Sequence, residues 1–298
     1  KTGWGRVVSV LKVYRLYPDV VFSKGGYASF PVLFAARLLR IPVVIHESDT
    51  VPGKVNKWAG KFAARVALSY KEAAKFFPSE KVALTSQPVR AEIAAPLTDG
   101  AREFLKIETD TPVVLILGGS LGAERINETI YEGLKSMIEK YVVIHQTGKN
   151  NFLEAKSTAA AVLFDSQHKE RYKPFDYLNA LAMRMAAGVS SIVVSRAGSA
   201  IFEIAAWGTP SIIVPISDSN GDHQRQNAFA YARTGACEVI EEAYLKRYIL
   251  LSEIDRLMVN AAMQEKMRAA AKAFYKPNAA RLVAVEVLKI ALGHEIAK

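Results

Sequence analysis

The sequence contains a single cysteine, Cys237, and this scarcity excludes an internal disulfide. A chain without disulfide pairs fits a reducing compartment, where we expect Cys237 to pack as a small buried hydrophobe. No unbroken apolar run approaches the ~18 residues that a membrane-spanning helix needs, and we find no secretory signal pattern. Half of the residues are hydrophobic, which favours a globular chain over a disordered one.

Zinc-finger spacings, RNP-type motifs and aromatic residues interleaved with basic ones are absent, so we expect no nucleic-acid partner. No pair of acidic residues is placed to hold a metal ion. The nearest candidates, Asp218 and Asp222, lie in a segment with the composition of a turn. We therefore expect neither a metal nor another cofactor.

The charge that is present is unevenly distributed along the chain. The formal net charge is +10, and residues 1–100 carry 15 Lys and Arg against 7 Asp and Glu. A basic first third can face nucleic acid, anionic lipid or phosphorylated substrates. Because the nucleic-acid motifs are missing, lipid and phosphorylated substrates are the better candidates.

Apolar, β-branched runs alternate with helical stretches through the whole chain. The first third predicts strands at 19–26, 41–47, 65–69 and 80–90 and helices at 30–40 and 52–63. After a polar boundary at 91–110, we expect strands at 111–119, 141–148, 161–165, 190–198, 210–217 and 237–242, and an amphipathic helix at 278–296. This alternation is typical of parallel sheets with crossover helices.

The pattern predicts an α/β chain of two Rossmann-like domains with a cleft between them, the first at 1–95 and the second at 96–275. The opening stretch, "KTGWGRVVSVLKVYRLYP", predicts a helix with no strand before it, so we expect the first domain to be incomplete. Ligands of such sheets bind outside the carboxyl ends of the strands. The residues that follow each strand are therefore the candidates for a site.

The first strand-end motif is "VVLILGGSLGAERIN", residues 113–127. Its glycines let the backbone turn sharply and approach a ligand closely, and the helix that follows offers N–H groups to a phosphate. Ser120 adds a hydroxyl. A tight turn that binds nothing is the alternative interpretation.

The second motif, "SRAGSAIFEIAAWG", repeats the sequence of strand, glycine and helix at residues 195–208. The helix start at Ser199 and Ala200 can take a diphosphate. Glu203, one turn further on, can accept hydrogen bonds from both hydroxyls of a ribose. Alternatively, Glu203 only complements the helix dipole.

The third motif, "SDSNGDHQRQN", is a polar loop at 217–227 that leads into a helix. His223 and Gln224 can read sugar hydroxyls, because imidazole and amide groups both donate and accept hydrogen bonds. A polar, capped helix start without a ligand is the alternative.

In this order and spacing, the three motifs resemble the C-terminal half of the MurG family, the UDP-N-acetylglucosamine transferases that act on undecaprenyl-diphospho-muramoyl-pentapeptide. The segments "SKGGYASFP", "IHESDTVPGKVNK", "TSQPVR" and "VIHQTGK" extend the resemblance over residues 18–245. It implies a GT-B fold, whose C-terminal helix, here 276–298, crosses back to the first domain. It also implies transfer of GlcNAc with inversion at the anomeric carbon and without a bound metal.

The resemblance implies roles for particular positions. Ser120 would contact the donor phosphates or sugar, Arg90 the nucleotide and Glu203 the ribose, while Gln224, with His223 beside it, would read the GlcNAc hydroxyls. The implied donor-side set is Asp49, Arg90, Gly119, Ser120, Gly122, Ser199, Ala200, Glu203, His223 and Gln224. The implied acceptor-side set is Gly25, Gly26, Tyr27 and Glu47.

The sequence also departs from the family pattern. Asp49 stands where the family has Asn, Ser48 where it has Gln, and Ser86 and Gln87 where it has Gly and Asn. A carboxylate at Asp49 disfavours a nearby diphosphate unless it is protonated or paired. Residues 1–18 contain no match to the family's glycine-rich, histidine-bearing loop (GGTGGH type), which carries the proposed general base, so the catalytic residue stays unassigned.

A lipid acceptor requires contact with the membrane. Trp4, Val7, Leu11 and Tyr14 stand among basic residues and can form an interfacial helix face on an anionic membrane surface. The alternative is that Val7, Leu11 and Tyr14 face the domain core. Trp4 is the preferred membrane residue, and we expect a peripheral protein on the cytoplasmic face of the cell membrane.

Three other functions stay open at this point. The chain can be another GT-B glycolipid glycosyltransferase, a UDP-sugar epimerase, or a catalytically incomplete chain that binds a UDP-sugar. An epimerase needs extra carboxylates around the sugar, which the sequence does not offer.

Overall fold

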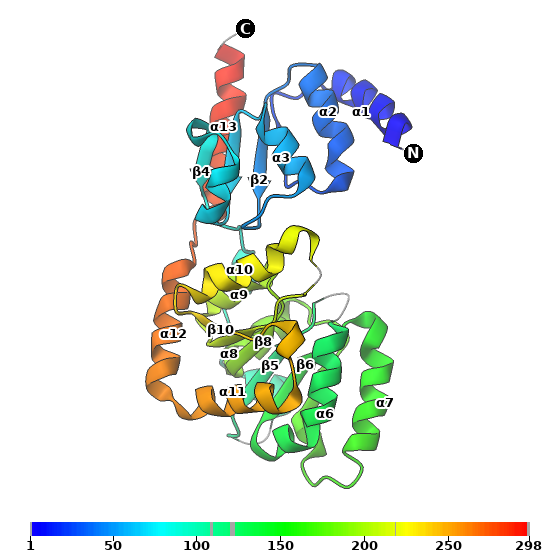
Figure 1. Ribbon diagram of the computed structural model, residues 1–298, viewed down its shortest axis with the longest axis vertical. Coiled ribbons are helices and arrows are strands. Elements are labelled where there is room, and N and C mark those ends of the chain that lie inside the picture. Colours follow the sequence, from blue (N-terminus) through cyan, green and yellow to red (C-terminus); the bar gives the residue numbers. More distant parts are fainter. Residues whose placement is uncertain (1, 108–109, 120–122, 218, 297–298) are drawn as a thin grey trace. The chain divides into compact units, whose positions relative to one another are not determined.

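The β-branched runs form two parallel sheets in the computed structural model, which describes residues 2–107, 110–119, 123–217 and 219–296 (Figure 1). The sheets belong to separate units. Unit 1 comprises Lys1–Pro88, Asn220–Gln226 and Lys276–Lys298, and unit 2 comprises Val89–Ser219 and Asn227–Tyr275. The prediction of two parallel-sheet α/β domains is confirmed.

Unit 1 contains a four-stranded parallel sheet in the order β1-β2-β3-β4. Its strands are β1 (Val21–Ser23), β2 (Val43–Glu47), β3 (Arg65–Leu68) and β4 (Val82–Leu84). Its helices are α1 (Thr2–Leu16), α2 (Phe30–Leu38), α3 (Lys54–Gly60) and α13 (Ala279–Ile296), with short 3₁₀ turns at Tyr27–Ser29, Lys71–Phe76 and Ser79–Lys81. Every residue of β2 is buried, because this strand has a neighbour on each side and helices over the sheet.

Helix α1 packs against α2 and buries only one narrow side. Val13 is 7% exposed, whereas Trp4 is 76% and Tyr14 65% exposed, and Val7 and Leu11 are exposed as well. The alternative that Val7, Leu11 and Tyr14 face the domain core is therefore wrong. The packing of α1 against α2 therefore leaves several apolar side chains of α1 exposed.

Helix α13 is part of unit 1 although it follows unit 2 in the sequence. The guanidinium Nε of Arg65, at the start of β3, lies 3.1 Å from Oε2 of Glu286 on α13. This ion pair fastens the helix to the sheet of unit 1, and Val283 is among the buried residues.

Unit 2 is built on a six-stranded parallel sheet in the order β10-β9-β8-β5-β6-β7. The strands are β5 (Val113–Leu117), β6 (Val142–Gln146), β7 (Tyr172–Phe175), β8 (Ser190–Ser195), β9 (Ser211–Ile213) and β10 (Cys237–Val239). The helices are α4 (Ala91–Ala94), α5 (Ala101–Phe104), α6 (Glu124–Lys140), α7 (Phe152–Val162), α8 (Ala180–Val189), α9 (Ala200–Trp207), α10 (His223–Ala232), α11 (Arg247–Val259) and α12 (Ala261–Phe274), of which α10 begins in unit 1. Cys237 is buried and unpaired, as predicted.

The central strand β5 divides the core of unit 2 into two layers. Val113, Leu115 and Leu117 join one apolar cluster, and Val114 and Ile116 join another. Successive side chains of a strand point to opposite faces of the sheet, so an unbroken apolar run fills both layers at once. Residues that follow β5 are thereby held at the carboxyl edge of the sheet.

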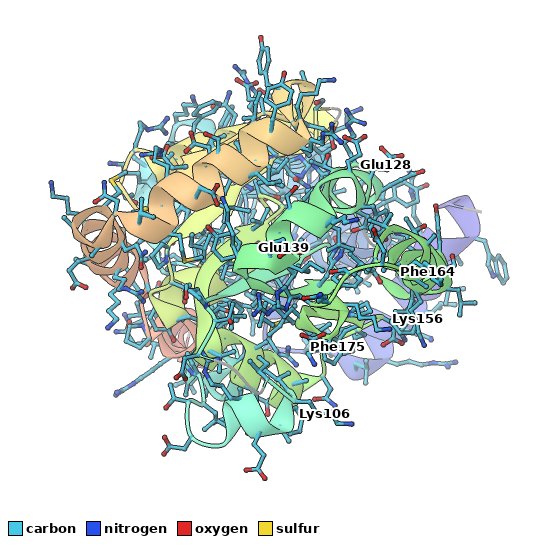
Figure 2. The ribbon with its side chains drawn as sticks, turned by 90° about the horizontal axis from the view of Figure 1, so that it is seen from below. Lys106, Glu128, Glu139, Lys156, Phe164 and Phe175 are labelled. Carbon is cyan, nitrogen blue, oxygen red and sulfur yellow. The ribbon has the colours of Figure 1, made fainter. Side chains whose placement is uncertain are left out.

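The predicted strand at 161–165 is wrong. Helix α7 continues to Val162, and Ala155, Ala159 and Leu163 are buried at helical spacing, so this apolar run completes a helix face. The outermost strand is instead β7, and its last residue, Phe175, is labelled in Figure 2. Phe164, just beyond α7 and labelled in the same view, is 87% exposed.

Candidate functional site

A cavity of ≈ 440 Å³ opens at the carboxyl ends of the strands of unit 2. The last residues of β5, β6 and β8 line it, together with the loop after β7 and the first turn of α9. Five of the predicted donor-side residues lie in its wall: Arg90, Gly119, Ser199, Ala200 and Glu203. The geometry thus brings together residues that are up to 113 positions apart in the sequence.

The remaining donor-side predictions do not fall in this wall. Ser120 and Gly122 lie outside the described residues. Asp49, His223 and Gln224 belong to unit 1, where His223 and Gln224 begin α10.

The glycine turn after β5 is required by packing. The Gly118 N–H donates to the carbonyl oxygen of Gln146 at 3.0 Å, and a Cβ at Gly118 would collide with that same oxygen. Gly119 has φ 76°, a left-handed backbone that favours glycine, and no atom lies within 4 Å of where its Cβ would be. A ligand can therefore approach the backbone at Gly119 closely.

Helix α9 points its first turn at the cavity. Ser199 precedes the helix and its side chain makes no capping hydrogen bond, so the first N–H groups are left without a side-chain cap. Glu203, one turn in, also lines the cavity. Burial raises the pKa of Glu203, and the positive charge of Arg90 acts in the opposite direction. The positive end of the helix dipole and one carboxylate acceptor therefore face the same cavity.

Arg90 lines the same cavity as Glu203. It precedes α4, its side chain is 60% exposed, and its Nη1 lies 3.7 Å from Oε1 of Glu92. A pair that exposed contributes little to stability, so a ligand anion can compete for the guanidinium.

The loop after β7 forms a wall that the sequence interpretation missed. Tyr177 and Leu178 line the cavity, and the Leu178 N–H donates to Gln146 Oε1 at 3.0 Å. The strand before them, "YKPF", contains Lys and Pro and so lacks the apolar run that marks a buried strand. The available signal was Asn179, whose side chain caps α8 by accepting from the Ala182 N–H.

Next to this wall, His145 is a structural residue. It is fully buried, with Nδ1 3.0 Å from the Tyr172 hydroxyl and Nε2 3.0 Å from Asn127 Oδ1. Burial lowers the pKa of His145 to about 3, so the ring is neutral at pH 7. Its two contacts join β6 to β7 and to α6.

Arg196 is a further cavity residue that the sequence interpretation missed. It lines the cavity directly after β8, forms an ion pair with Glu242 and donates through Nη1 to the Val214 carbonyl oxygen at 3.2 Å. Glu242 Oε2 in turn accepts from the Ser217 N–H at 3.1 Å. This chain of contacts braces the loop that follows β9.

The predicted acceptor-side residues gather at the carboxyl edge of the other sheet, in unit 1. Glu47 is 3% exposed, its Oε2 accepts from Asn56 Nδ2 at 2.8 Å, and its Oε1 accepts from the Asp49 N–H at 2.9 Å. Burial raises the pKa of Glu47, and the two hydrogen bonds lower it. Glu47 therefore holds the loop after β2 in place.

The Gly25–Gly26 turn follows β1 at the same edge. Both glycines have φ 82°, and a Cβ at Gly25 would collide with the side-chain amide of Asn56. No atom lies within 4 Å of the corresponding point at Gly26, and Tyr27 is 75% exposed. The turn therefore needs glycine at Gly25 for packing and leaves its outer face open.

Beneath this edge lies a buried histidine. His46 Nε2 lies 3.1 Å from the carbonyl oxygen of Ser86 and 3.4 Å from Ser69 Oγ. Burial lowers the pKa of His46 to about 4, so this ring is also neutral at pH 7. Ser86 itself has φ 68°, a left-handed conformation that a residue with a side chain rarely adopts.

No group of three or more His, Cys, Asp or Glu side chains within the described ranges is arranged to hold a metal ion. Across the same part of the chain, no helix has the length and apolar character to cross a membrane.

The chain is similar to known glycosyltransferases. Sequence profiles of the glycosyltransferase family 28 N-terminal and C-terminal domains match residues 1–68 and 113–283, respectively. A UDP-N-acetylglucosamine–N-acetylmuramyl-(pentapeptide) pyrophosphoryl-undecaprenol N-acetylglucosamine transferase 2 of Bacillus cereus is 38% identical over 262 residues, which are 87% of this chain and 71% of that protein. The corresponding transferase of Thermodesulfovibrio yellowstonii is 38% identical over 88% of this chain and 70% of its own length.

Solved structures agree with these relatives. The crystal structure of Acinetobacter baumannii MurG superposes with a TM-score of 0.76 at 26% identity, covering 95% of this chain and 78% of that one. A Staphylococcus aureus MnaA structure with UDP gives a TM-score of 0.72 at 15% identity, over 95% of this chain and 79% of that one. The second likeness shows the fold alone.

Proposed function

The chain belongs to glycosyltransferase family 28, within the MurG group of UDP-N-acetylglucosamine transferases, and on this basis we propose which ligands bind in the unit 2 cavity and at the carboxyl edge of the unit 1 sheet. UDP-GlcNAc binds in the cavity of unit 2, and the lipid-linked muramoyl-pentapeptide is the acceptor that receives the GlcNAc. The reaction serves peptidoglycan synthesis, as the names of its relatives imply.

One observation carries this proposal: a carboxylate, a guanidinium and an uncapped helix start share one cavity. The first turn of α9 and the guanidinium of Arg90 are suited to the diphosphate. Glu203 is suited to the ribose hydroxyls, because a carboxylate accepts hydrogen bonds from both. Tyr177 and Leu178 supply an apolar wall for the base.

The chemistry is a single displacement at the anomeric carbon of GlcNAc. An acceptor hydroxyl oxygen bonds to that carbon, its proton passes to a base, and the bond to the diphosphate oxygen of UDP breaks, which inverts the centre. Negative charge develops on the departing UDP. The positive end of the α9 dipole and the charge of Arg90 stabilise it.

The acceptor carries a lipid, so we infer peripheral contact with a membrane through α1. Trp4, Leu11 and Tyr14 are exposed on this helix, next to Lys12 and Arg15. An apolar face with basic neighbours is typical of helices that lie at an anionic interface. The cytoplasmic face of the cell membrane is where such an enzyme would find a nucleotide-sugar and a lipid-linked acceptor together.

The alternative of a UDP-sugar epimerase has less support. The epimerase structures that superpose on this chain share 14–16% identity with it and show the fold alone. The relatives at 37–39% identity are transferases by name.

The donor site is tested by calorimetric titration of the 298-residue chain with UDP-GlcNAc and, as the control ligand, with UDP-glucose. We expect preferential binding of UDP-GlcNAc. Glu203→Ala should weaken it by about tenfold to a hundredfold, because hydrogen bonds to a charged group contribute ~1.5–3 kcal/mol. Glu203→Gln should lose less than Glu203→Ala, since the amide still accepts one hydrogen bond.

Glu265→Ala is the matched control, since Glu265 is an exposed carboxylate on α12 outside the cavity wall. Equal affinities for Glu203→Ala and Glu265→Ala would exclude the proposed ribose contact. Absence of any UDP-GlcNAc binding by the unaltered chain would contradict the donor site as a whole.

A further inference from the structure

The sheet of unit 2 has an open edge at β10. This strand is the outermost in the order β10-β9-β8-β5-β6-β7, and within the described residues no strand pairs with its other side. It bonds to β9 in parallel, with Cys237 opposite Ser211 and Val239 opposite Ile213. An edge of this kind presents backbone N–H and C=O groups that a further strand can pair with.

The hydrogen bonds of β10 determine which of its backbone groups face outward. The Ile240 N–H donates to the Ile213 carbonyl oxygen at 3.1 Å, so it points toward β9. Along a strand, successive residues direct their N–H and C=O groups to alternate sides. The N–H and C=O groups of Val239, and those of Cys237 two positions earlier, therefore point away from β9.

A cavity of ≈ 380 Å³ lies at this edge, and we call it the β10 groove. Phe229 of α10 lines it, as do Tyr244, Ile249 and Glu253 and the strand-end residues 238–241 (Figure 1). The whole lining belongs to unit 2, and none of these residues lines the donor cavity. The β10 groove is thus a second concave surface of the same unit.

The two faces of β10 differ in chemistry at the groove. Glu238 accepts a hydrogen bond from Arg256 Nη2 of α11 at 2.7 Å, so its side chain points to the face that α11 covers. Val239 points to the opposite face, where it packs against the apolar cluster that contains Ala228 of α10. A strand added beside β10 would direct alternate side chains to a carboxylate-bearing face and to an apolar face.

The charge of the β10 groove is opposite in sign to that of the chain. Its wall carries the carboxylates of Glu238, Glu241 and Glu253 and one guanidinium, that of Arg256, whereas the whole chain has a formal net charge of +10. Arg256 Nη2 lies 2.7 Å from Glu238 and 2.8 Å from Glu253, so one positive charge is shared between two carboxylates. These three side chains are 30% to 44% exposed and so remain accessible to a second cation.

The same charges disfavour pairing of two copies of this chain through β10. In a symmetric pair each surface patch meets itself, so the carboxylates of one copy would face those of the other. Like charges that lie opposite each other on paired strands are destabilising. Charge complementarity instead favours a partner strand with basic side chains.

We propose that the β10 groove binds an extended, basic segment of another protein, which adds as a strand to the open edge of β10. Backbone hydrogen bonds to Cys237 and Val239 hold the segment, as is general for recognition by strand addition. Its Lys or Arg side chains reach the carboxylates beside α11, and the residues between them lie on the apolar face. Binding of this segment does not depend on the sugar transfer proposed above.

The probe is the fluorescein-labelled peptide Thr-Lys-Val-Lys-Val-Lys-Thr, titrated with the full 298-residue chain and followed by fluorescence anisotropy at low ionic strength. Its alternating Lys and Val residues match the two faces of β10. The control peptide Thr-Lys-Lys-Lys-Val-Val-Thr has the same charge and composition without the alternation. We expect the alternating peptide to bind at least about fivefold more tightly, because cross-strand pairs contribute ~0.2–1 kcal/mol each. Equal affinities, or no binding of the alternating peptide, would overturn the inference.

Val239→Pro tests the backbone contact. Proline removes an N–H that points away from β9, so the ladder between β10 and β9 is retained. We expect about tenfold weaker binding of the alternating peptide, because one hydrogen bond is lost and the proline ring obstructs the added strand. Val239→Ala keeps the N–H and is the matched control, so equal losses in the two variants would exclude strand addition.

Substitutions of charged side chains test the groove without altering its backbone. Arg256→Met releases Glu238 and Glu253 and should strengthen binding of the alternating peptide by about twofold to fivefold. Glu238→Gln combined with Glu253→Gln should weaken it by a similar factor of about twofold to fivefold. Lys266→Met, at an exposed residue of α12 outside the groove, is the control. Equal gains for Arg256→Met and Lys266→Met would show only general charge attraction and would overturn the inference.

Two further measurements separate this inference from its alternatives. In sedimentation velocity, a concentration-dependent dimer that Val239→Pro abolishes would assign the β10 groove to a second copy of the chain and overturn the inference. In UDP-GlcNAc titration, Val239→Pro should bind the donor as the unaltered chain does, because no residue lines both cavities. Failure of the unaltered chain to bind UDP-GlcNAc would count against the proposed function alone, since the peptide titrations do not involve the donor.

Discussion

Individual residues at both sheet edges are fixed by contacts that no sequence pattern shows. Lys24 meets Gln87 from 63 positions away, and Ser86 has a backbone conformation that its residue type does not favour. The strand-end glycines were predictable, because a glycine after an apolar run marks a turn. The contact between Lys24 and Gln87 was not, because it depends on how the strands of the sheet are arranged.

Ser86 provides a prediction at this scale. A left-handed conformation costs a residue with a side chain ~1–2 kcal/mol, and glycine costs ~0.5–1 kcal/mol of extra chain entropy. We therefore expect Ser86→Gly to stabilise unit 1 by ~0.5–1 kcal/mol, measured by urea unfolding. Thr85→Gly, at a neighbour without a positive φ, should destabilise it. The strain argument is refuted if both substitutions destabilise equally.

At the scale of elements, the sequence predicted most strands and helices where the apolar periodicity was clear. It failed at the β7 edge, because an alanine-rich helix end resembles a buried strand and the true strand carries Lys and Pro. Tyr177 and Leu178 were missed for the same reason, since a strand must be located before the residues after it can be chosen. Helix α1 was predicted as a helix, but only the structure determined which of its sides is covered.

The exposed side of α1 leads to a prediction for membranes. Trp4→Ser combined with Leu11→Ser should weaken binding to phosphatidylglycerol vesicles by at least about tenfold, because each apolar side chain contributes ~1.5–3 kcal/mol when buried. Co-sedimentation with vesicles measures the effect. Phe164→Ser, at an equally exposed aromatic residue of unit 2, is the control. Equal losses in the two variants would exclude α1 as the membrane contact.

At the scale of the whole molecule, a buried, neutral histidine is present in each unit. The pKa is about 4 for His46 in unit 1 and about 3 for His145 in unit 2, both below the value of 6.5 in an unfolded chain. Between those limits the unfolded state binds protons that the native state does not, so stability rises with pH and is lost as pH falls below 6.5.

The magnitude follows from the same linkage. When the pH is lowered from 7 to 5, each histidine should lower the free energy of unfolding by about 2 kcal/mol. Glu47 and Glu203 should offset part of this loss, because their raised pKa values act in the opposite sense. Denaturant unfolding at several pH values measures the slope. His145→Asn should reduce the slope for unit 2 by about one proton relative to the unaltered chain. Identical slopes would contradict the assignment.

The return of α13 to unit 1 has a consequence for synthesis in the cell. Residues 276–298 leave the ribosome after all of unit 2, so unit 1 emerges first but cannot be completed until last. During that interval the nascent unit 1 sheet lacks the helix that Arg65 and Glu286 fasten to it. Domains that emerge whole can fold as they appear. Unit 1 is therefore completed only after the ~190 residues between Pro88 and Lys276 have been translated, at ~5–20 residues per second.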